Sequence, residues 1–320
     1  MILTPSVYEH AAACIGETPW SVSRNFELLV KAHSKAYTFY HHSPIVVGID
    51  IYNLEAEAYG AEVSRPEGNG IPAITEHICG SAAEVAALPF FDPSRSGRIP
   101  MIIEAGIKLK KEFMDADVRV PLSGPFSIAV NLMGFEKLLE SIAFDPDGVR
   151  NALHHIVRGQ YVFAEQVARA GLGIAFFESA AVPPLLSPDQ FRKVEFPPLR
   201  QIMKQTAEIT GQPVPCIIGG DTEPILDEMI RTGTTYLICP AETDQKAFIK
   251  KIRKRPDITV RINMKPETIS KGTVQEIIHE IDRIADLART LNNACIGTGA
   301  VPYETPKENV ITAIKYAEKL

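Results

Sequence analysis

The sequence predicts an α/β fold, a (β/α)₈ or TIM barrel with an N-terminal helical cap. Short apolar, β-branched runs alternate with helix-length amphipathic segments, and this alternation indicates a parallel sheet. About eight such units fit within one chain of 320 residues, which favours a closed barrel in a single domain. An open doubly wound sheet is the alternative, but no Gly-x-Gly-x-x-Gly follows an early strand.

The expected elements follow one another in a regular order. Residues 1–43 form the cap, with a helix at 21–38, and the barrel occupies the remainder of the single domain 1–320. Helices are expected to begin where Ser or Thr precedes Pro, as at Ser187-Pro188 and Thr305-Pro306. The expected strands are 44–50, 74–78, 118–122, 173–178, 214–218, 235–239, 258–263 and 294–297, and the main helices are 100–113, 146–170, 188–210, 224–231, 245–253, 274–290 and 306–318.

The composition excludes several classes of protein. Hydrophobic residues make up 45% and charged residues 22%, and the formal net charge is −6, so no basic surface for nucleic acid is expected. No apolar run is long enough to span a bilayer, and the N-terminus lacks a signal-peptide pattern. Five scattered cysteines without a CxxC pair fit a reducing compartment. We therefore expect a cytoplasmic protein without a membrane or nucleic-acid partner, and the oligomeric state stays open.

Functional side chains of a barrel lie at the carboxyl ends of its strands, so these positions supply the catalytic candidates. Asp50 ends an apolar run and is expected to orient a substrate or act as general acid or base, with a helix cap as the alternative. Glu178 follows two Phe residues, which predicts a raised pKa unless a salt bridge holds it. Asp221 lies in a Gly-Gly-Asp-Thr turn and is either a helix cap or a site residue.

Further positions are candidates for substrate and metal binding. Glu55 and Glu57 share one side if their segment is extended. If it is helical, one of them faces the pocket and the other faces solvent, and the alternative is that both are solvated. Cys216, Cys239 and Glu178 fall on neighbouring expected strands and would form a zinc site with an open fourth position; the alternative is that both thiols are small buried hydrophobic groups. The substrate-binding candidates are Glu55, Glu57, Asn263, Thr298 and Tyr303.

Five sequence blocks resemble one known family. They are GIDIYNLEAEAYGAEV at 48–63, SGPFSIA at 123–129, FES at 177–179 with LSPDQF at 186–191, GGDT at 219–222, and GTG at 297–299 with TPKEN at 305–309. In this order and over almost the whole chain, they resemble the uroporphyrinogen decarboxylase superfamily, whose fold is a TIM barrel. Each block alone is a weak signal, and their order makes the resemblance strong.

The N-terminal block separates two branches of that superfamily. Tetrapyrrole decarboxylases carry an arginine-containing motif similar to RQAGRY, whose guanidinium groups bind the substrate carboxylates. Here the segment 19–32 reads PWSVSRNFELLVKA, with Arg24 alone, so tetrapyrrole decarboxylation is not expected. This block and GIDIYNLEAEAYG resemble the methylcobamide:coenzyme M methyltransferases. That resemblance implies a partner protein carrying a corrinoid (methylcobalamin) and a zinc ion that activates a thiol.

The chain departs from that branch at its zinc ligands. The His-x-Cys before the GDT turn is replaced by Ile217 and Gly219, and the later Cys is Thr298. Zinc is therefore expected only if Cys216, Cys239 and Glu178 bind it instead. The expected activity is methyl transfer between a small methoxy, methylamine or thiol compound and a corrinoid protein, as one component of a demethylase system in one-carbon metabolism. The alternatives are a decarboxylase or lyase that uses Asp50 on a small carboxylic acid, and a non-enzymatic component that binds the corrinoid protein.

Overall fold

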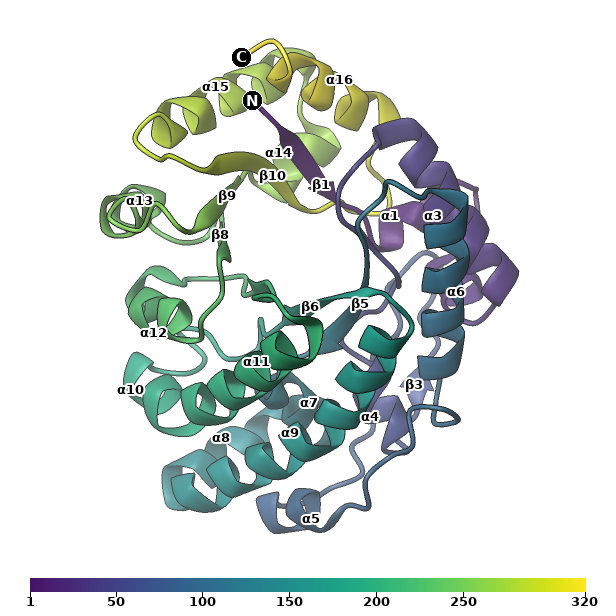
Figure 1. Cartoon of the computed structure of the whole chain (residues 1–320), viewed down its shortest axis with the longest axis vertical. Helices are drawn as coiled ribbons and strands as arrows, with labels where there is room; N and C mark the ends of the chain where they lie inside the picture. The colour runs from purple at the N-terminus through teal and green to yellow at the C-terminus, as the bar shows by residue number, and fades with distance from the viewer.

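The computed structural model describes residues 1–320, and its parallel strands surround a common centre with helices outside them (Figure 1). The strands form two four-stranded groups, ordered β2-β5-β6-β7 and β1-β10-β9-β8, and every pairing within them is parallel. Strands β7 and β8 contact each other where the two groups meet. The barrel strands are β1 (Leu3–Ser6), β2 (Ile45–Val46), β5 (Val118–Ser123), β6 (Gly173–Phe177), β7 (Cys216–Ile217), β8 (Tyr236–Cys239), β9 (Thr259–Asn263) and β10 (Ala294–Ala300).

The N-terminal segment corrects the expected cap, because its first residues form a strand of the barrel. Leu3 pairs with Ile296 on β10, and the register shifts before Ser6 reaches Ala300. Pro5 lies at this irregularity and has no N–H to donate to a ladder. The expected cap is therefore reduced to the three helices that follow β1, which are α1 (Glu9–Ala13), α2 (Pro19–Ser23) and α3 (Phe26–Tyr40). The expected helix at 21–38 is interrupted because the Asn25 side chain caps α3 by accepting from the Leu28 N–H.

The strand expected at 74–78 is not part of the barrel. Its first residue belongs to β4 (Ala73–Ile74), which pairs antiparallel with β3 (Val63–Ser64) to form a small hairpin. The hairpin is joined to the loop after β2 because the Asn53 side-chain N–H donates to the Pro72 carbonyl at 2.8 Å. The 74–78 run therefore begins in this hairpin, outside the barrel.

Each of the seven amphipathic segments expected after the cap contains a helix, whereas the helices at Ala82–Ala87, Pro125–Met133, Phe135–Phe144 and Pro266–Lys271 were not expected. The segment 188–210 is divided by a π-helical turn at Phe191–Glu195, and 224–231 begins with a 3₁₀ turn at Glu223–Ile225. No helix combines the length and the apolar character that crossing a membrane requires. The helices are α4 (Leu54–Ala58), α5 (Ala82–Ala87), α6 (Ile99–Glu112), α7 (Pro125–Met133), α8 (Phe135–Phe144), α9 (Pro146–Arg169), α10 (Pro188–Gln190), α11 (Phe196–Thr210), α12 (Leu226–Arg231), α13 (Gln245–Ile252), α14 (Pro266–Lys271), α15 (Val274–Ala288) and α16 (Lys307–Ala317).

The buried apolar side chains form one large and one small cluster. A core of 81 residues includes apolar side chains of both the barrel strands and the surrounding helices. A second cluster of Tyr8, Val46, Ile51, Ala175 and Phe177 is separate from it. Successive side chains of a strand point to opposite faces, so Phe176 packs in the large cluster while Phe177 belongs to the small one. This alternation decides which strand-end residues face the centre of the barrel.

The place of β1 in the barrel is tested by shortening one of its buried side chains. Leu3→Ala should lower the free energy of unfolding by about 2–4 kcal/mol, because Leu3 is 6% exposed in the main core. Ile2→Ala is the matched control, because Ile2 is 70% exposed and should change stability little. Urea denaturation measures both, and equal effects of the two changes would contradict the barrel position of this segment.

Candidate active site

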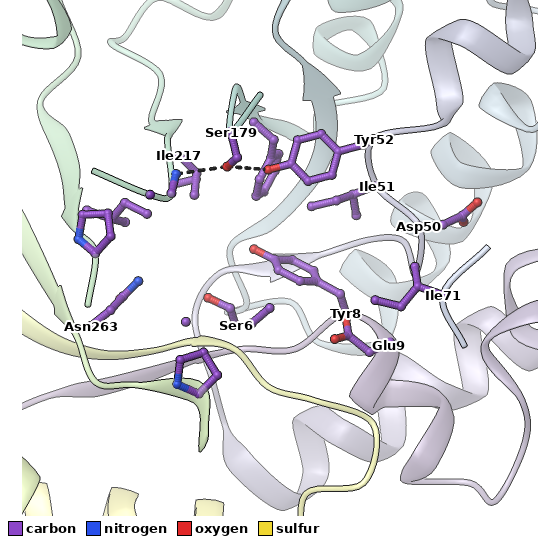
Figure 2. A pocket seen from close by; sticks show the side chains of 18 of the residues that line it. Ser6, Tyr8, Glu9, Asp50, Ile51, Tyr52, Ile71, Ser179, Ile217 and Asn263 are labelled. Carbon is purple, nitrogen blue, oxygen red and sulfur yellow. Dashed lines mark hydrogen bonds between the residues drawn. The ribbon is translucent and has the colours of Figure 1, made fainter. Parts of the chain in front are cut away.

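A cavity of about 500 Å³ opens at the carboxyl ends of the barrel strands (Figure 2). Every barrel strand except β5 contributes a residue at its end or in the loop after it, and the hairpin adds Ile71, Pro72 and Ala73. The wall is largely apolar and includes Ile51 and Phe177. This volume lies in the range of about 300–1,000 Å³ that is usual for small-molecule sites. The position matches the catalytic face of this fold, so the cavity is the candidate active site.

Two hydroxyl groups form a hydrogen-bonded pair on the cavity wall. The Tyr52 hydroxyl donates to Ser179 Oγ at 2.8 Å, and the Gly219 N–H donates to the same oxygen at 3.0 Å. Because Ser179 accepts twice, its own proton is left to donate to a ligand. Burial raises the Tyr52 pKa, so the phenol stays protonated. Sequence reasoning missed both residues, although Tyr52 lies two positions after Asp50 and Ser179 directly follows Glu178.

Glu9 places a carboxyl group on the same cavity. It lies in the first turn of α1, is buried, and forms no salt bridge. Desolvation raises its pKa from the ordinary 4.5 to about 7, so it exchanges a proton near neutral pH. A carboxyl group tuned in this way is suited to general acid and base catalysis. Glu9 was missed because the strand before it was taken as part of a cap.

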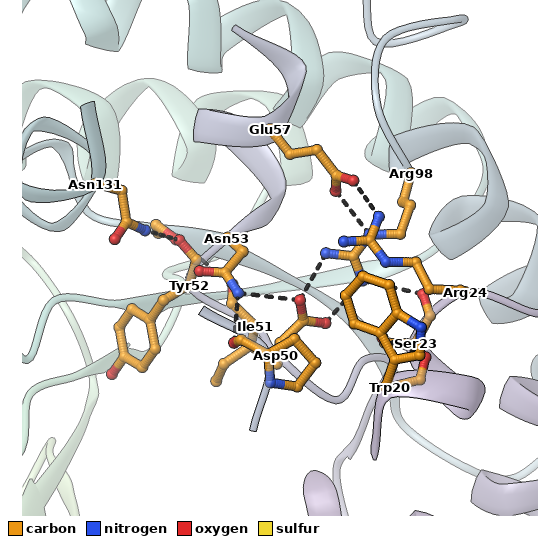
Figure 3. Close-up of polar contacts among 12 residues, drawn as sticks. Trp20, Ser23, Arg24, Asp50, Ile51, Tyr52, Asn53, Glu57, Arg98 and Asn131 are labelled. Atoms are coloured by element: carbon orange, nitrogen blue, oxygen red, sulfur yellow. Dashed lines mark hydrogen bonds and ion pairs between the residues drawn. The ribbon is translucent and has the colours of Figure 1, made fainter. Parts of the chain in front are cut away.

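Asp50 also lines the cavity, but both of its carboxylate oxygens are bound by the protein (Figure 3). Arg98 donates from Nη1 to Oδ1 and from Nη2 to Oδ2, each at 2.7 Å, and Asn53 donates to Oδ2 at 3.0 Å. The same guanidinium donates from Nε to Glu57 at 2.6 Å and from Nη1 to the Ser23 carbonyl at 3.0 Å. This arrangement favours a structural anchor over the expected catalytic role.

The two glutamates of α4 point away from the cavity, which corrects the expectation that one of them faces it. Glu55 is fully buried and accepts the Ser123 N–H at 2.8 Å, while its second oxygen has no partner. Desolvation raises its pKa to about 8. Glu57 forms ion pairs with Arg24 and Arg98. Neither residue is in contact with the cavity.

Glu178 lies on the opposite face of β6 from the cavity, because Phe177 before it and Ser179 after it line the space. Its carboxyl group accepts the Phe126 and Ser127 N–H groups at 3.1 and 2.9 Å at the start of α7. Burial raises its pKa and that of the neighbouring Glu195, both of which are fully buried. The expected role of Glu178 in the cavity is therefore wrong, and the group supports α7.

The three expected zinc ligands do not form a metal site. Cys216 and Cys239 alternate along their strands with Ile217 and Ile238, which line the cavity, so both thiols point away from it. Burial raises both thiol pKa values, as expected for small thiols packed in the apolar core. No group of three or more His, Cys, Asp or Glu side chains is arranged to hold a metal ion. These residues do not fit the zinc expected from them and from Glu178.

Three further candidates for the site, Asp221, Thr298 and Tyr303, do not line the cavity. Each forms a hydrogen bond that connects segments near the barrel mouth. Asp221 accepts the Thr243 hydroxyl at 2.8 Å, which joins its turn to the loop before α13. Thr298 is fully buried, accepts the Ser6 N–H at 3.2 Å, and so joins β1 to β10. Tyr303 donates to the Glu17 carbonyl at 3.0 Å. Their expected catalytic or substrate-binding roles are not supported by these positions.

Strand β9 supplies two inward polar side chains. Asn263 lines the cavity as expected, and its side chain reaches toward the space in Figure 2. Arg261 lies two residues earlier on the same face and also lines it. A Cβ on Gly297 would lie 2.1 Å from Asn263 Oδ1 and 2.8 Å from Arg261 Cδ, so this glycine gives both side chains room. Arg261 was missed because it lies inside a strand, before its end.

Removing the Arg98 guanidinium tests the anchor. Arg98→Gln should lower the free energy of unfolding by about 3–5 kcal/mol, because it leaves the buried Asp50 carboxylate without its ion-pair partner. Arg95→Gln removes an exposed partner of Asp92 and should leave stability nearly unchanged. Denaturant unfolding compares the two variants. A small loss for Arg98→Gln would show that Asp50 is not held in this way.

Glu55 should make the protein less stable as the pH rises. Its folded pKa of about 8 exceeds the ordinary 4.5, so folding favours the protonated form, and stability should fall between these pH values. Glu55→Gln mimics the protonated group and should be more stable than the native protein above pH 8, by roughly 2–4 kcal/mol. Glu62→Gln, on the exposed segment after α4, is the control. Thermal unfolding across pH measures this, and parallel curves for Glu55→Gln and the native chain would refute it.

Comparison with known proteins shows which family the chain belongs to. A sequence profile of uroporphyrinogen decarboxylase (URO-D) matches residues 4–320, whereas no curated protein shows significant sequence similarity. Among solved structures, a methyltransferase from Methanosarcina mazei has a TM-score of 0.85 at 21% identity, covering 99% of this chain and 94% of that one. This similarity confirms the expected barrel fold.

Two other solved structures are only distantly similar. A β-glycosidase from Thermosphaera aggregans has a TM-score of 0.47 at 10% identity, covering 92% of this chain and 84% of that one. A putative vitamin-B12 independent methionine synthase from Listeria monocytogenes has a TM-score of 0.46 at 11% identity, over 68% of each chain. Neither bears on the activity. Because the family profile spans nearly the whole chain, this protein belongs to the uroporphyrinogen decarboxylase family.

Proposed function

We propose that the protein is an enzyme that transfers a methyl group between a small substrate in the cavity and a corrinoid carried by a partner protein. The cavity itself carries this proposal, because an apolar space at the catalytic face holds Glu9, a carboxyl group with a pKa of about 7. The N-terminal resemblance to methylcobamide:coenzyme M methyltransferases supports it. The whole-chain similarity to the Methanosarcina mazei methyltransferase supports it as well.

The residues of the cavity suit the proton balance of methyl transfer. When the bond between a methyl carbon and its oxygen or nitrogen breaks, the heteroatom keeps the electron pair and must gain a proton. Glu9 in its protonated form supplies that proton, and the Ser179 hydroxyl, held by Tyr52 and Gly219, donates a hydrogen bond to the same region. A reduced corrinoid supplies the nucleophile that accepts the methyl group. In the reverse direction Glu9 accepts the proton.

The cavity mouth suits a partner that brings its corrinoid from outside. The lining residues belong to the loops after the strands, and Ile71 of the hairpin is half exposed at its edge. The Cys216, Cys239 and Glu178 side chains point elsewhere, so we assign no step to zinc. Decarboxylation by Asp50 has less support, because Arg98 occupies both of its oxygens. A purely binding component would not need the raised pKa of Glu9.

The proposal is tested by methyl transfer to free reduced cobalamin, followed by its absorbance change, with methoxy, methylamine and methylthio compounds. Glu9→Gln should lower the rate by about 10²–10⁴-fold. With the native enzyme, the rate of methyl removal should fall as the pH rises above about 7, because Glu9 loses the proton it donates. Glu27→Gln, an exposed position on α3, is the matched control and should keep full activity. No transfer from any compound would contradict the proposed function.

A further inference from the structure

We infer that the hydroxyl pair of Tyr52 and Ser179 binds the atom from which the methyl group leaves, and that this atom is an ether oxygen. The geometry of the two hydroxyl groups, the apolar wall around them and the positive charge on the cavity carry this inference. The leaving methyl group rests on the proposed function, whereas the hydrogen bond from Ser179 to a ligand oxygen does not. The inference narrows the candidate substrates from methoxy, methylamine and thiol compounds to the first class.

Ser179 offers the cavity a hydrogen-bond donor that no protein group uses. Its oxygen accepts from the Tyr52 hydroxyl at 2.8 Å and from the Gly219 N–H at 3.0 Å, as the dashed lines in Figure 2 show. Both lone pairs of this oxygen are therefore occupied, and the Ser179 proton is the remaining donor of the pair. Ser179 lines the cavity, so a ligand that accepts a hydrogen bond can bind this proton.

The pair is held in place before a ligand arrives. The Asn131 side chain donates to the Tyr52 carbonyl at 2.7 Å, and the Tyr52 ring packs edge to face against Phe177, with 6.1 Å between the ring centroids. On the other side, the Gly219 N–H binds the Ser179 oxygen from the loop after β7. A donor that is oriented in advance needs no reorganisation when charge develops on the atom it binds.

The wall around the pair is apolar. Tyr52 and Ile217 pack against the small cluster that includes Ile51 and Phe177, and all four residues line the cavity. A hydrogen bond is stronger in such surroundings than in water, and a buried donor without a partner is costly. The Ser179 hydroxyl therefore favours a ligand that places an acceptor beside it over a ligand of the same shape that lacks one.

Positions that the methyltransferase resemblance assigns to metal ligands contribute to this wall instead. Ile217 lines the cavity with an apolar side chain, and Gly219 offers its N–H to Ser179. The third position, Thr298, does not line the cavity, and its hydroxyl donates to the Gly299 carbonyl at 2.7 Å. None of the three supplies the imidazole, thiolate or carboxylate that zinc binds. In this chain, hydrogen bonding by Ser179 replaces a metal ion as the group that stabilises the leaving atom.

An ether oxygen is the atom that suits this donor. It is neutral and has lone pairs, whereas the sulfur of a thioether accepts hydrogen bonds only weakly. A methylated amine is an ammonium ion at neutral pH and has no lone pair with which to accept. Its charge would also add to that of Arg261 on the same cavity, and Glu9 in its protonated form carries no charge to offset either.

The hydroxyl pair acts as the methyl group leaves. The bond between the methyl carbon and the oxygen breaks, the oxygen keeps the electron pair, and the methyl group passes to the reduced corrinoid of the proposed function. The charge that develops on the oxygen strengthens its hydrogen bond from Ser179, which Tyr52 and Gly219 polarise. Glu9 then gives the oxygen its proton, so the product is an alcohol or a phenol. Ser179 keeps its own proton throughout.

The test compares three ligands that differ at one position: methoxybenzene, methylthiobenzene and ethylbenzene. Isothermal titration should show that Ser179→Ala weakens the binding of methoxybenzene about 2–10-fold, as expected for one lost hydrogen bond between neutral groups. The binding of methylthiobenzene and ethylbenzene should stay nearly unchanged, because neither pairs well with the hydroxyl. Ser141→Ala, which removes a hydroxyl on α8 outside the cavity, is the matched control and should leave all three unchanged.

Ethylbenzene separates this role from a structural one, because its binding reports whether the cavity of a variant is intact. Should Ser179→Ala fail to fold, Tyr52→Phe tests the same pair, since it keeps the ring and removes only the hydroxyl. Tyr52 acts through Ser179 as a positioning residue, so Tyr52→Phe should lower kcat and leave KM close to the native value. No binding of methoxybenzene by the native protein, or an equal loss for methoxybenzene and ethylbenzene in Ser179→Ala, would overturn the inference.

Methyl transfer to free reduced cobalamin separates this inference from the proposed function. Methoxy compounds should lose their methyl group, and methylthio and methylamine compounds should not. Ser179→Ala should lower kcat about 10²–10³-fold, as for the loss of one donor to a developing oxyanion. Transfer from methylthio or methylamine compounds at the rate of methoxy compounds would contradict the inference and support the proposed function. If methoxybenzene binding depends on Ser179 but no compound transfers its methyl group, the oxygen site stands and the proposed function fails.

Discussion

Burying a charged side chain costs free energy, and this cost constrains how the barrel is built. At the barrel mouth the Arg98 guanidinium offsets most of this cost. It binds Asp50 through two hydrogen bonds, Glu57 through a third, and the end of α2 through the Ser23 carbonyl. These contacts fix the loop after β2. In that loop the Asn53 side chain holds the hairpin, and the backbone before it positions Tyr52. The cavity wall therefore depends on an ion pair that does not itself take part in the proposed chemistry.

The protein accommodates its other buried ionisable side chains in two different ways. Glu55, Glu178 and Glu195 reduce the cost by keeping a proton, as their raised pKa values indicate. Arg261 cannot lose its proton, and the protein gives it no acid. It faces the cavity, where a ligand reaches it. Folding thus leaves one buried positive charge on the cavity wall without an acidic partner.

The sequence predicted the positions of most strands and helices well. It predicted poorly which side chains point toward the cavity. Apolar runs predicted seven of the barrel strands, but β1 was missed because Pro5 interrupts a short run. The strand-end rule found the correct height for Glu178, Cys216 and Cys239, yet the one-residue alternation turns all three of them away from the cavity. Pairing register decides that alternation, and it is set by contacts between distant strands. The same rule could not find Arg261, which lies within its strand.

The central claim is that Glu9 exchanges a proton with the ligand of this cavity near neutral pH, because burial raises its pKa to about 7. A carbon-13 NMR titration of the Glu9 side chain in the folded protein tests it most directly. We predict a titration midpoint near pH 7 for this carboxyl group. A midpoint near its ordinary value of 4.5 would contradict the account.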